Sequence, residues 1–364
     1  MRVTFIAPVA NLSGGCRIIA EHARLLYERG HDVTVVCGRR GKPSLKARLK
    51  KMARGQLGRG ARQQASHLDN MPYPVVQLDR SRPITANDVP DADVILSSWW
   101  QTTEWMAEFP DCKGIKVNFL QHHEVHPWLP VERVRAVWRL PIQKIVVSRW
   151  LQEIARHEYG DHGAILVPNG VDADHFRSVE RGLSRQWVIG AMASGLQRTS
   201  FKRFWLAVET VKVLQSRGHD IRFIGFGNVI EHDHLPDGSR FEVSPEQSRI
   251  AEIYGSCDCW LFTSDKEGYG LPLLESMACG TPVVATPAGA APELLESGGG
   301  VLVESDDPNH LADAVERVML QPDADWRAMS RAAREEAERH SWSVIGDQME
   351  AALHQILDSS NTTV

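Results

Sequence analysis

The stretch SDKEGYGLPLLESMACGTPVVAT, residues 264–286, follows an apolar run, CWLFTS (259–264), that predicts a buried strand. Pro272 suits the first turn of a helix, where its missing N–H removes no hydrogen bond, and Gly280 stands where a helix commonly ends. The run TPVVAT (281–286) predicts the next strand. The stretch therefore indicates a strand, a turn, a helix and a second strand, which is one step of an alternating α/β fold.

Two glutamates, Glu267 in the turn and Glu275 in the expected first helical turn, surround Gly268 and Gly270. Open α/β sheets bind ligands at this edge, where glycines and a helix N-terminus favour a phosphate. A carboxylate repels phosphate, so the glutamates are expected to accept hydrogen bonds from hydroxyls, one from a ribose and one from a sugar. The pattern favours a nucleotide-sugar site, although the spacing alone is equally typical of a solvated loop charge and a helix-capping carboxylate.

Alternating strands and helices extend through the chain in two arrays that restart after VPNGVDADHF (167–176). We expect two Rossmann-like domains facing each other, 1–172 and 173–340, followed by an amphipathic helix within 341–364. The expected strands are 3–7, 32–37, 93–98, 115–120, 144–148, 187–194, 221–227, 259–264, 281–286 and 300–304, and the expected helices begin near 14, 148, 203, 245, 272, 307 and 341.

The composition is that of an average globular protein, with 43% hydrophobic and 24% charged residues and a net charge of −5. Six scattered cysteines without a Cys-x-x-Cys pair, no signal-peptide pattern and no apolar run of about 18 residues predict a cytoplasmic protein. Ten Lys or Arg and no acidic residue lie between Val33 and Leu68. We expect the segment 39–62 to be either a solvated loop or a contact with an anionic membrane surface. Nucleic acid is excluded because the rest of the chain is acidic.

Several stretches resemble glycosyltransferase family 4, whose members are retaining enzymes of the GT-B fold. They are EGYGLPLLESMACGTPVVATPAGAAPELL (267–295), VPNGVDADHF, DADVILSSWWQTTEWM (91–106) and SWSVIGDQMEAAL (341–353). The resemblance implies the transfer of a sugar from a UDP-, GDP- or dTDP-linked donor to a hydroxyl of a glycan, lipid or small molecule. The donor would be bound by residues 173–340 and the acceptor by the N-terminal domain. The resemblance also implies that no cofactor or metal is needed and that the last helix crosses back to the first domain.

The resemblance assigns roles to the second domain. In the loop ASGLQRTSFKRF (193–204), Lys202 and Arg198 would hold the leaving diphosphate, although Gln197 stands where the family pattern has an arginine. Glu275 would bind the ribose and Glu267 the donor sugar. Arg203 is expected to be a solvated residue at a helix start. The remaining donor-binding candidates come from the same turn: Ser264, Gly268, Tyr269, Gly270 and Leu271.

In the first domain, Gly14 and Gly15 either approach the donor or acceptor or only permit tight packing. NFLQHHEVHPW (118–128) follows a strand whose end carries a histidine in the family, and either Gln121 or His122 takes that position. The acceptor-side candidates are Gln121, His123, Trp99 and Trp100.

A metal site at His122, His123, Glu124 and His126 is rejected, because the spacing of His123 and His126 is one residue short of H-E-x-x-H and Pro127 follows at once. Two alternatives to transfer remain: a nucleotide-sugar epimerase of the same fold, and a protein that only binds the nucleotide sugar.

Overall fold

In the computed structural model, the described residues are 1–40, 65–193, 200–228 and 235–361. The chain divides into two compact units. The first consists of Met1–Val146, Gln152–Val167 and Gly346–Val364, and the second of Val147–Leu151 and Pro168–Ile345. The chain thus enters the second unit briefly at the start of a helix, and its final helix returns to the first unit.

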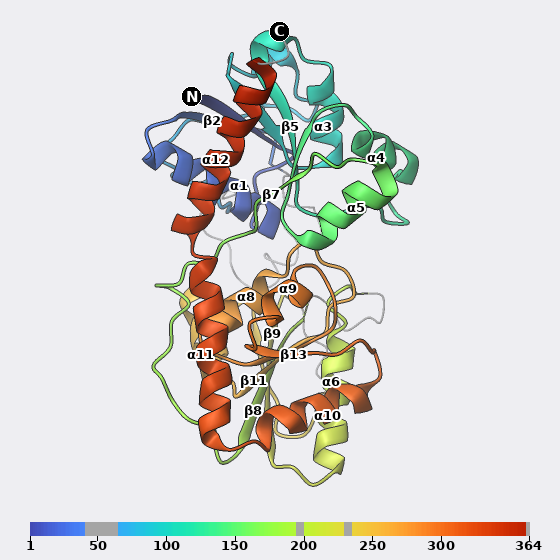
Figure 1. The fold of residues 1–364 in the computed structure, drawn as a ribbon, viewed down its shortest axis with the longest axis vertical. Helices are drawn as coiled ribbons and strands as arrows, with labels where there is room; N and C mark the ends of the chain where they lie inside the picture. Colours follow the sequence, from blue (N-terminus) through green and yellow to red (C-terminus); the bar gives the residue numbers. More distant parts are fainter. Residues whose placement is uncertain (41–64, 194–199, 229–234, 362–364) are drawn as a thin grey trace, which may run out of the picture. The chain divides into compact units, whose positions relative to one another are not determined.

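The first unit is built on a seven-stranded, wholly parallel sheet with the order β3-β2-β1-β4-β5-β6-β7. Helices pack against it, among them α1, whose buried face includes Ile18, Ile19 and Leu26 (Figure 1). The element bounds are β1 Arg2–Ala7, α1 Gly14–Glu28, β2 Asp32–Cys37, β3 Val75–Gln77, β4 Val94–Ser97, α3 Trp100–Ala107, β5 Ile115–Leu120, α4 Val131–Trp138, β6 Gln143–Val146, α5 Arg149–Tyr159, β7 Ile165–Leu166 and α12 Trp342–Asn361.

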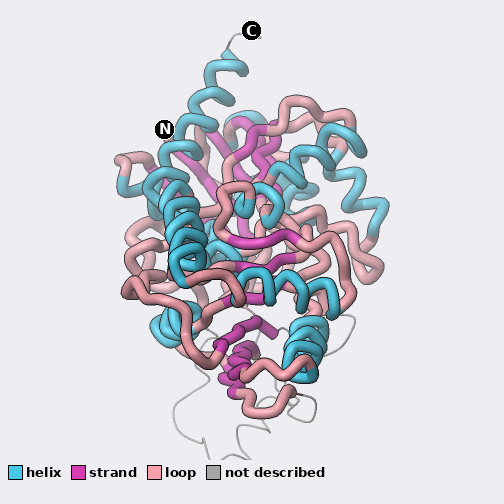
Figure 2. The backbone as a smooth tube through the Cα atoms, turned by 60° about the horizontal axis from the view of Figure 1, so that its bottom comes forward, coloured by secondary structure: helices cyan, strands magenta, loops and turns pink. Residues whose placement is uncertain are grey.

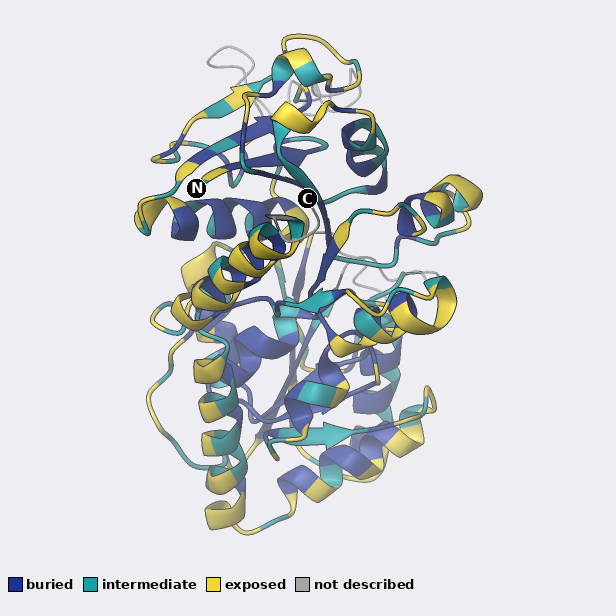
Figure 3. Cartoon of the chain, turned by 45° about the horizontal axis from the view of Figure 1, so that its top comes forward, coloured by how far each residue is buried: buried dark blue, intermediate teal, exposed yellow. Residues whose placement is uncertain are grey.

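The second unit holds a six-stranded parallel sheet with the order β10-β9-β8-β11-β12-β13. Figure 2 shows these strands with helices around them, and Figure 3 shows that buried residues line the strands while exposed ones lie on outer helix faces. The bounds are β8 Trp187–Ala193, α6 Phe204–Ser216, β9 Ile221–Gly227, β10 Arg240–Val243, α7 Gln247–Ser256, β11 Cys259–Phe262, α8 Leu271–Ala278, β12 Val283–Ala285, α9 Ala291–Leu295, β13 Gly300–Leu302, α10 Pro308–Met319 and α11 Asp323–Arg339.

A buried polar network ties the amino ends of β8 and β11 together. The carboxylate of Asp258, which is fully buried, accepts hydrogen bonds from Arg181 Nη1 (2.5 Å), Ser184 Oγ (3.0 Å) and the backbone N–H of Val188 (2.8 Å). The indole of Trp326, on α11, donates to the Asp258 carbonyl oxygen at 3.0 Å. This network fixes the amino ends of β8 and β11 relative to each other. It thereby also helps to position the carboxyl ends of the same two strands.

The strand order of the second sheet places a topological switch point between β8 and β11. These strands pair in parallel, and the chain proceeds from β8 to β9 on one side and from β11 to β12 on the other. Crossovers that diverge in this way leave an opening beyond the carboxyl ends of the two central strands. The carboxyl ends of β8, at Ala193, and of β11, at Phe262, therefore lie at the position where α/β proteins bind ligands.

Candidate functional site

Lys202, Glu267 and Ser264 meet at the carboxyl ends of β8 and β11. Lys202 Nζ lies 2.5 Å from Glu267 Oε1, and Ser264 Oγ donates to the same oxygen at 2.8 Å. The two charged side chains are 20% and 15% exposed. The hydroxyl of Thr263 also donates to the carbonyl oxygen of Lys202 at 3.0 Å. The structure therefore brings a cation to a carboxylate and a hydroxyl that lie more than sixty residues further along the sequence.

Two glycines with positive φ shape the turn between Glu267 and α8: Gly270 lies within the turn, and Gly289 packs against it from beyond β12. Gly270 has φ of +108° and precedes the helix, and a Cβ there would lie 2.9 Å from the ring of Phe262. Gly289 has φ of +59°, and a Cβ there would lie 2.5 Å from the carbonyl oxygen of Tyr269. A third contact comes from Ser148, whose buried hydroxyl donates to the carbonyl oxygen of Gly268 at 2.8 Å. The turn is therefore held in place at Gly268 and Gly270, which the sequence singled out, and at Gly289, which it did not.

Glu275 lies in the second turn of α8, not in the first as expected from the sequence, because the helix already begins at Leu271. Its side chain is buried, and Tyr254 donates its phenolic O–H to Glu275 Oε2 at 3.1 Å. Pro272 in the first turn and Gly280 after the helix, with φ of +72°, confirm the predicted start and end. Because Tyr254 holds one oxygen of this buried carboxylate, the group is already oriented to accept a hydrogen bond from a hydroxyl of a ligand.

Tyr269 is buried, so its side chain does not offer a surface to a ligand. No described residue lies within hydrogen-bonding distance of its phenolic oxygen, and its carbonyl oxygen accepts from the backbone N–H of Ala290 at 2.8 Å. Burial, with Glu293 and Glu336 as the nearest charges, raises the pKa of the Tyr269 phenol well above its usual value. The residue anchors the turn, and Leu271, half-buried, follows it at the start of α8.

Arg203 is not the solvated residue that the sequence suggested. It has a left-handed backbone (φ 41°), and its guanidinium donates to the carbonyl oxygens of Thr263 (3.0 Å) and Ser264 (3.3 Å). It thereby joins the start of α6 to the end of β11, a role that no local sequence pattern indicates. Arg198 and Gln197 lie outside the described residues.

In the first unit, Gly14 and Gly15 form the exposed first turn of α1. Ser13 caps this helix by accepting from the backbone N–H of Cys16 at 3.3 Å. A Cβ on Gly15 would meet no described atom within 4 Å, so tight packing within the described structure does not explain this glycine.

The histidines after β5 have different surroundings. His123 is bonded through Nε2 to the hydroxyl of Tyr159 (2.9 Å), and its ring packs edge-on against Trp138. The backbone N–H of Glu124 donates to His122 Nδ1 at 3.0 Å, which leaves the proton of a neutral His122 ring on Nε2. His123 is thus part of the packed interior, while His122 lies beside the buried Glu124.

The tryptophans before β5 lie at the start of α3. Trp99 is its N-terminal cap residue and is half-buried, whereas Trp100 is 5% exposed. The guanidinium of Arg133 lies 4.8 Å from the centre of the Trp100 ring. Gln121 follows β5 directly and is half-buried. The structure therefore gathers Gln121, His122 and Trp100 near the carboxyl ends of two neighbouring strands, β4 and β5.

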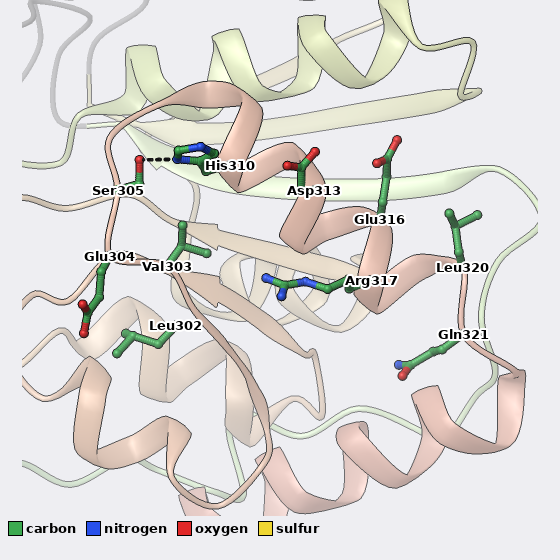
Figure 4. Close-up of a pocket in the computed structure, with 10 residues that line it drawn as sticks. All are labelled: Leu302, Val303, Glu304, Ser305, His310, Asp313, Glu316, Arg317, Leu320 and Gln321. Atoms are coloured by element: carbon green, nitrogen blue, oxygen red, sulfur yellow. Dashed lines mark hydrogen bonds between the residues drawn. The ribbon is translucent and has the colours of Figure 1, made fainter.

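A separate hollow of about 860 Å³ lies between β13 and α10 (Figure 4). It is lined by Leu302, Val303, Glu304, Ser305, His310, Asp313, Glu316, Arg317, Leu320 and Gln321. Its carboxylates include Asp313 and Glu316, which form ion pairs with Arg217. None of the residues singled out from the sequence lines this hollow, so its size does not make it the candidate site.

Two further properties concern the described part of the chain. In it, no three His, Cys, Asp or Glu side chains gather as ligands of a metal ion would. None of its helices is long and apolar enough to cross a membrane.

Comparison with known proteins links the second unit to a family. Residues 202–338 match the family model described as glycosyl transferases group 1. The D-inositol 3-phosphate glycosyltransferase of Saccharomonospora viridis is 38% identical over 117 residues, 32% of this chain and 27% of the relative. That of Mycobacterium avium is 34% identical over 139 residues, 37% of this chain and 33% of the relative. The chain thus matches about a third of the length of these curated relatives.

Solved structures resemble the whole chain. Sucrose-phosphate synthase from Thermosynechococcus elongatus has a TM-score of 0.72 at 16% identity, covering 99% of this chain and 100% of the other. Alr3699/HepE from Anabaena, solved in complex with UDP-glucose, has a TM-score of 0.71 at 17% identity, covering 98% and 100%. Together with the two parallel α/β sheets, these likenesses show that the chain has the GT-B fold of two Rossmann-like domains, and its residues 202–338 carry the pattern of the group 1 glycosyl transferases.

Proposed function

We propose that the protein is a retaining, metal-independent glycosyltransferase that moves a sugar from a nucleotide-sugar donor to an acceptor hydroxyl. The observation that carries this proposal is the half-buried Lys202–Glu267 pair at the carboxyl ends of β8 and β11, inside the segment that matches the family model. A fixed cation at this edge of a Rossmann-like sheet suits the diphosphate, and the adjoining carboxylate suits sugar hydroxyls.

The donor would replace the pairing between these two side chains. As the bond between sugar and diphosphate breaks, negative charge develops on the leaving phosphate, and the Lys202 ammonium, with Arg198, would stabilise it. Glu267 would then accept hydrogen bonds from the donor sugar, with Ser264 Oγ keeping its carboxylate oriented. Glu275, oriented by Tyr254, would accept the ribose hydroxyls.

The choice of substrates is also a proposal. A neighbour of the same fold is solved with UDP and glucose, which favours a UDP-linked donor over the GDP- and dTDP-linked ones. The acceptor, a glycan, lipid or small molecule, would be bound by residues 1–172, where the acceptor-side candidates are Gln121, His123, Trp99 and Trp100. Gly14 and Gly15 would approach the donor or the acceptor, and His122 or Gln121 would take the family's histidine position. Most of the basic segment 39–62 lies outside the described residues. We propose that the protein is cytoplasmic and that this segment contacts an anionic membrane surface.

A panel of UDP-, GDP-, dTDP- and ADP-sugars tests the function directly. We expect one donor class to raise the melting temperature and to release its nucleoside diphosphate slowly, as followed by mass spectrometry. Formation of a new sugar nucleotide without free diphosphate would instead identify an epimerase. Stabilisation without any turnover, with or without candidate acceptors, would identify a protein that only binds the nucleotide sugar.

Replacing Glu275 with glutamine is expected to raise KM for the donor about 10- to 100-fold, with a smaller change in kcat. The amide oxygen can still accept from Tyr254, so the fold is kept, but the ribose loses a charged hydrogen-bond acceptor worth about 1.5–3 kcal/mol. Steady-state kinetics on the donor identified by the panel measures the change.

The matched control for this variant is Glu252→Gln on α7, whose side chain is 65% exposed. The control should leave KM unchanged. An unchanged donor KM in Glu275→Gln itself would remove Glu275 from the donor site.

A further inference from the structure

Arg203, the residue after Lys202, has a backbone conformation that is costly for an arginine. Its φ is 41° and its ψ is 43°, in the left-handed region, which costs a residue with a side chain about 1 kcal/mol or more. It also stands at the N-terminus of α6, where the helix dipole is unfavourable to a cation. Glycine would adopt this backbone more easily and would carry no charge. The two costs indicate that the Arg203 side chain makes contacts that compensate them.

The guanidinium of Arg203 binds the end of β11. Its Nε donates to the carbonyl oxygen of Thr263 at 3.0 Å, and its Nη2 donates to that of Ser264 at 3.3 Å. Nη1 lies 4.0 Å from Asp265 and 3.8 Å from Asp306, whose exposed carboxylates attract it only weakly. The Arg203 side chain is 16% exposed. The planar guanidinium, with donors in fixed directions, therefore joins two successive carbonyl oxygens, which a lysine ammonium is less suited to do.

Hydrogen bonds in the opposite direction hold Lys202 and its neighbours against the same strand end. The backbone N–H of Asp265 donates to the carbonyl oxygen of Phe201 at 2.7 Å. The hydroxyl of Thr263 donates to the carbonyl oxygen of Lys202 at 3.0 Å, with that of Arg203 at 3.1 Å. Three successive residues are thus bonded to the end of β11, which comes some sixty residues later in the chain. These bonds fix the backbone from which the Lys202 side chain extends.

The same strand end also holds the partner of Lys202. Ser264, whose carbonyl oxygen accepts from Arg203, donates through its hydroxyl to Glu267 Oε1 at 2.8 Å. Lys202 Nζ lies 2.5 Å from the same carboxylate oxygen. Loss of the Arg203 bonds would therefore loosen both the backbone that carries the ammonium and the residue that orients the carboxylate.

We propose that Arg203 is a positioning residue, which holds the Lys202 ammonium where the donor diphosphate binds and does not contact the donor itself. This inference rests on the proposed function and adds to it the residue that places its cation. A lysine side chain has a flexible stem with about 2 kcal/mol of rotamer entropy, so an ammonium on a mobile backbone would spend less time beside the leaving phosphate. Fixing the backbone reduces what has to be ordered when negative charge develops there.

The first test is Arg203→Gly, assayed by release of nucleoside diphosphate from the donor that the panel identifies. Glycine adopts the left-handed backbone at less cost, so the relieved strain offsets part of the lost hydrogen bonding and the variant should fold. A misplacement of about 1 Å can lower a rate about 10²-fold, so we expect kcat at saturating donor to fall about 10-fold or more. KM for the donor should change less, because the Lys202 charge acts mainly as the bond breaks.

A double-mutant cycle with Lys202→Met separates a positioning role from a direct one. If Arg203 acts through the ammonium, Arg203→Gly should change kcat by less than about twofold once the ammonium is absent. An equal loss of kcat in the wild-type and Lys202→Met backgrounds would mean that Arg203 acts independently of Lys202, and it would overturn the inference. A kcat of Arg203→Gly within about twofold of the wild type would overturn it as well.

The matched control is Arg217→Gly at the other end of α6, where the guanidinium pairs with Asp313 and Glu316. It removes the same charge from the same helix and should leave kcat unchanged. If Arg203→Gly does not fold, Arg203→Lys replaces it. The lysine keeps the charge but not the fork of donors, so kcat should still fall, and an unchanged kcat overturns the inference. A wild-type protein that turns over no donor would instead contradict the proposed function itself.

Discussion

Replacing Lys202 with methionine is expected to lower the rate of nucleoside diphosphate release by about 10²–10³-fold at saturating donor. The ammonium pairs with Glu267 in the absence of donor; once the bound donor has replaced this pairing, the ammonium is expected to lie beside the phosphate on which charge develops. Methionine keeps most of the apolar stem and removes the charge. The effect should appear in kcat more than in KM, because the charge on the diphosphate grows as the bond breaks.

The matched control is Lys212→Met on α6, where the lysine forms an exposed pair with Glu209. Exposed pairs of this kind contribute little to stability, and Lys212 is on the helix that follows Lys202. It should change neither kcat nor the melting temperature appreciably. If Lys202→Met turns over donor as fast as Lys212→Met does, the ammonium does not stabilise the leaving group.

Replacing Arg181 with glutamine is expected to reduce the free energy of unfolding by about 3 kcal/mol. Its guanidinium compensates the fully buried Asp258, and it also donates to the carbonyl oxygen of Cys257 at 2.5 Å. Without it, the carboxylate would keep its bonds to Ser184 and Val188 but lose the one ion-pair partner that it has among the described residues. Urea unfolding followed by tryptophan fluorescence measures the loss, since Trp326 contacts the same network.

Arg185→Gln serves as the control, because Arg185 is exposed and lies four residues further along the same segment. Its unfolding midpoint should match that of the wild type. Equal midpoints for Arg181→Gln and the control would mean that Asp258 is compensated by its hydrogen bonds alone. Because this network lies at the amino ends of β8 and β11, we expect the folded Arg181→Gln variant to retain donor binding.

The local pattern of apolar and polar residues was sufficient to predict most of the strands and the helices with a clear apolar stripe. The predicted strands 115–120 and 221–227 agree with β5 and β9 to the residue, since continuous apolar runs bounded by turns mark buried parallel strands. Helix α11 was not predicted. Its buried residues are few, Trp326, Ala333 and Ala337, and its other residues are mostly charged, so its apolar face is narrow.

The site was predictable only where one short segment contains it. Glu267, Gly268, Gly270 and Ser264 could be singled out because they belong to a single turn between a strand and a helix. Arg203 was misjudged, because its partners, the carbonyl oxygens at the end of β11, lie sixty residues away in the chain. Glu124 was weighed only as a metal ligand, since nothing in its neighbours reveals that it is buried.

The sequence by itself determined the order of the strands and helices, the two α/β arrays and the turn at 264–270, because these depend on periodicity and on glycine and proline over a few residues. The tertiary structure alone decided which side chains meet. The Lys202–Glu267 pair, the hydroxyl of Ser148 on Gly268 and the bonds from Arg203 to the end of β11 all depend on parallel strands that bring distant segments to one sheet edge. Burial at this edge determines how strongly each charged group interacts with its partners, and burial is a property of the packed fold rather than of any local run of residues.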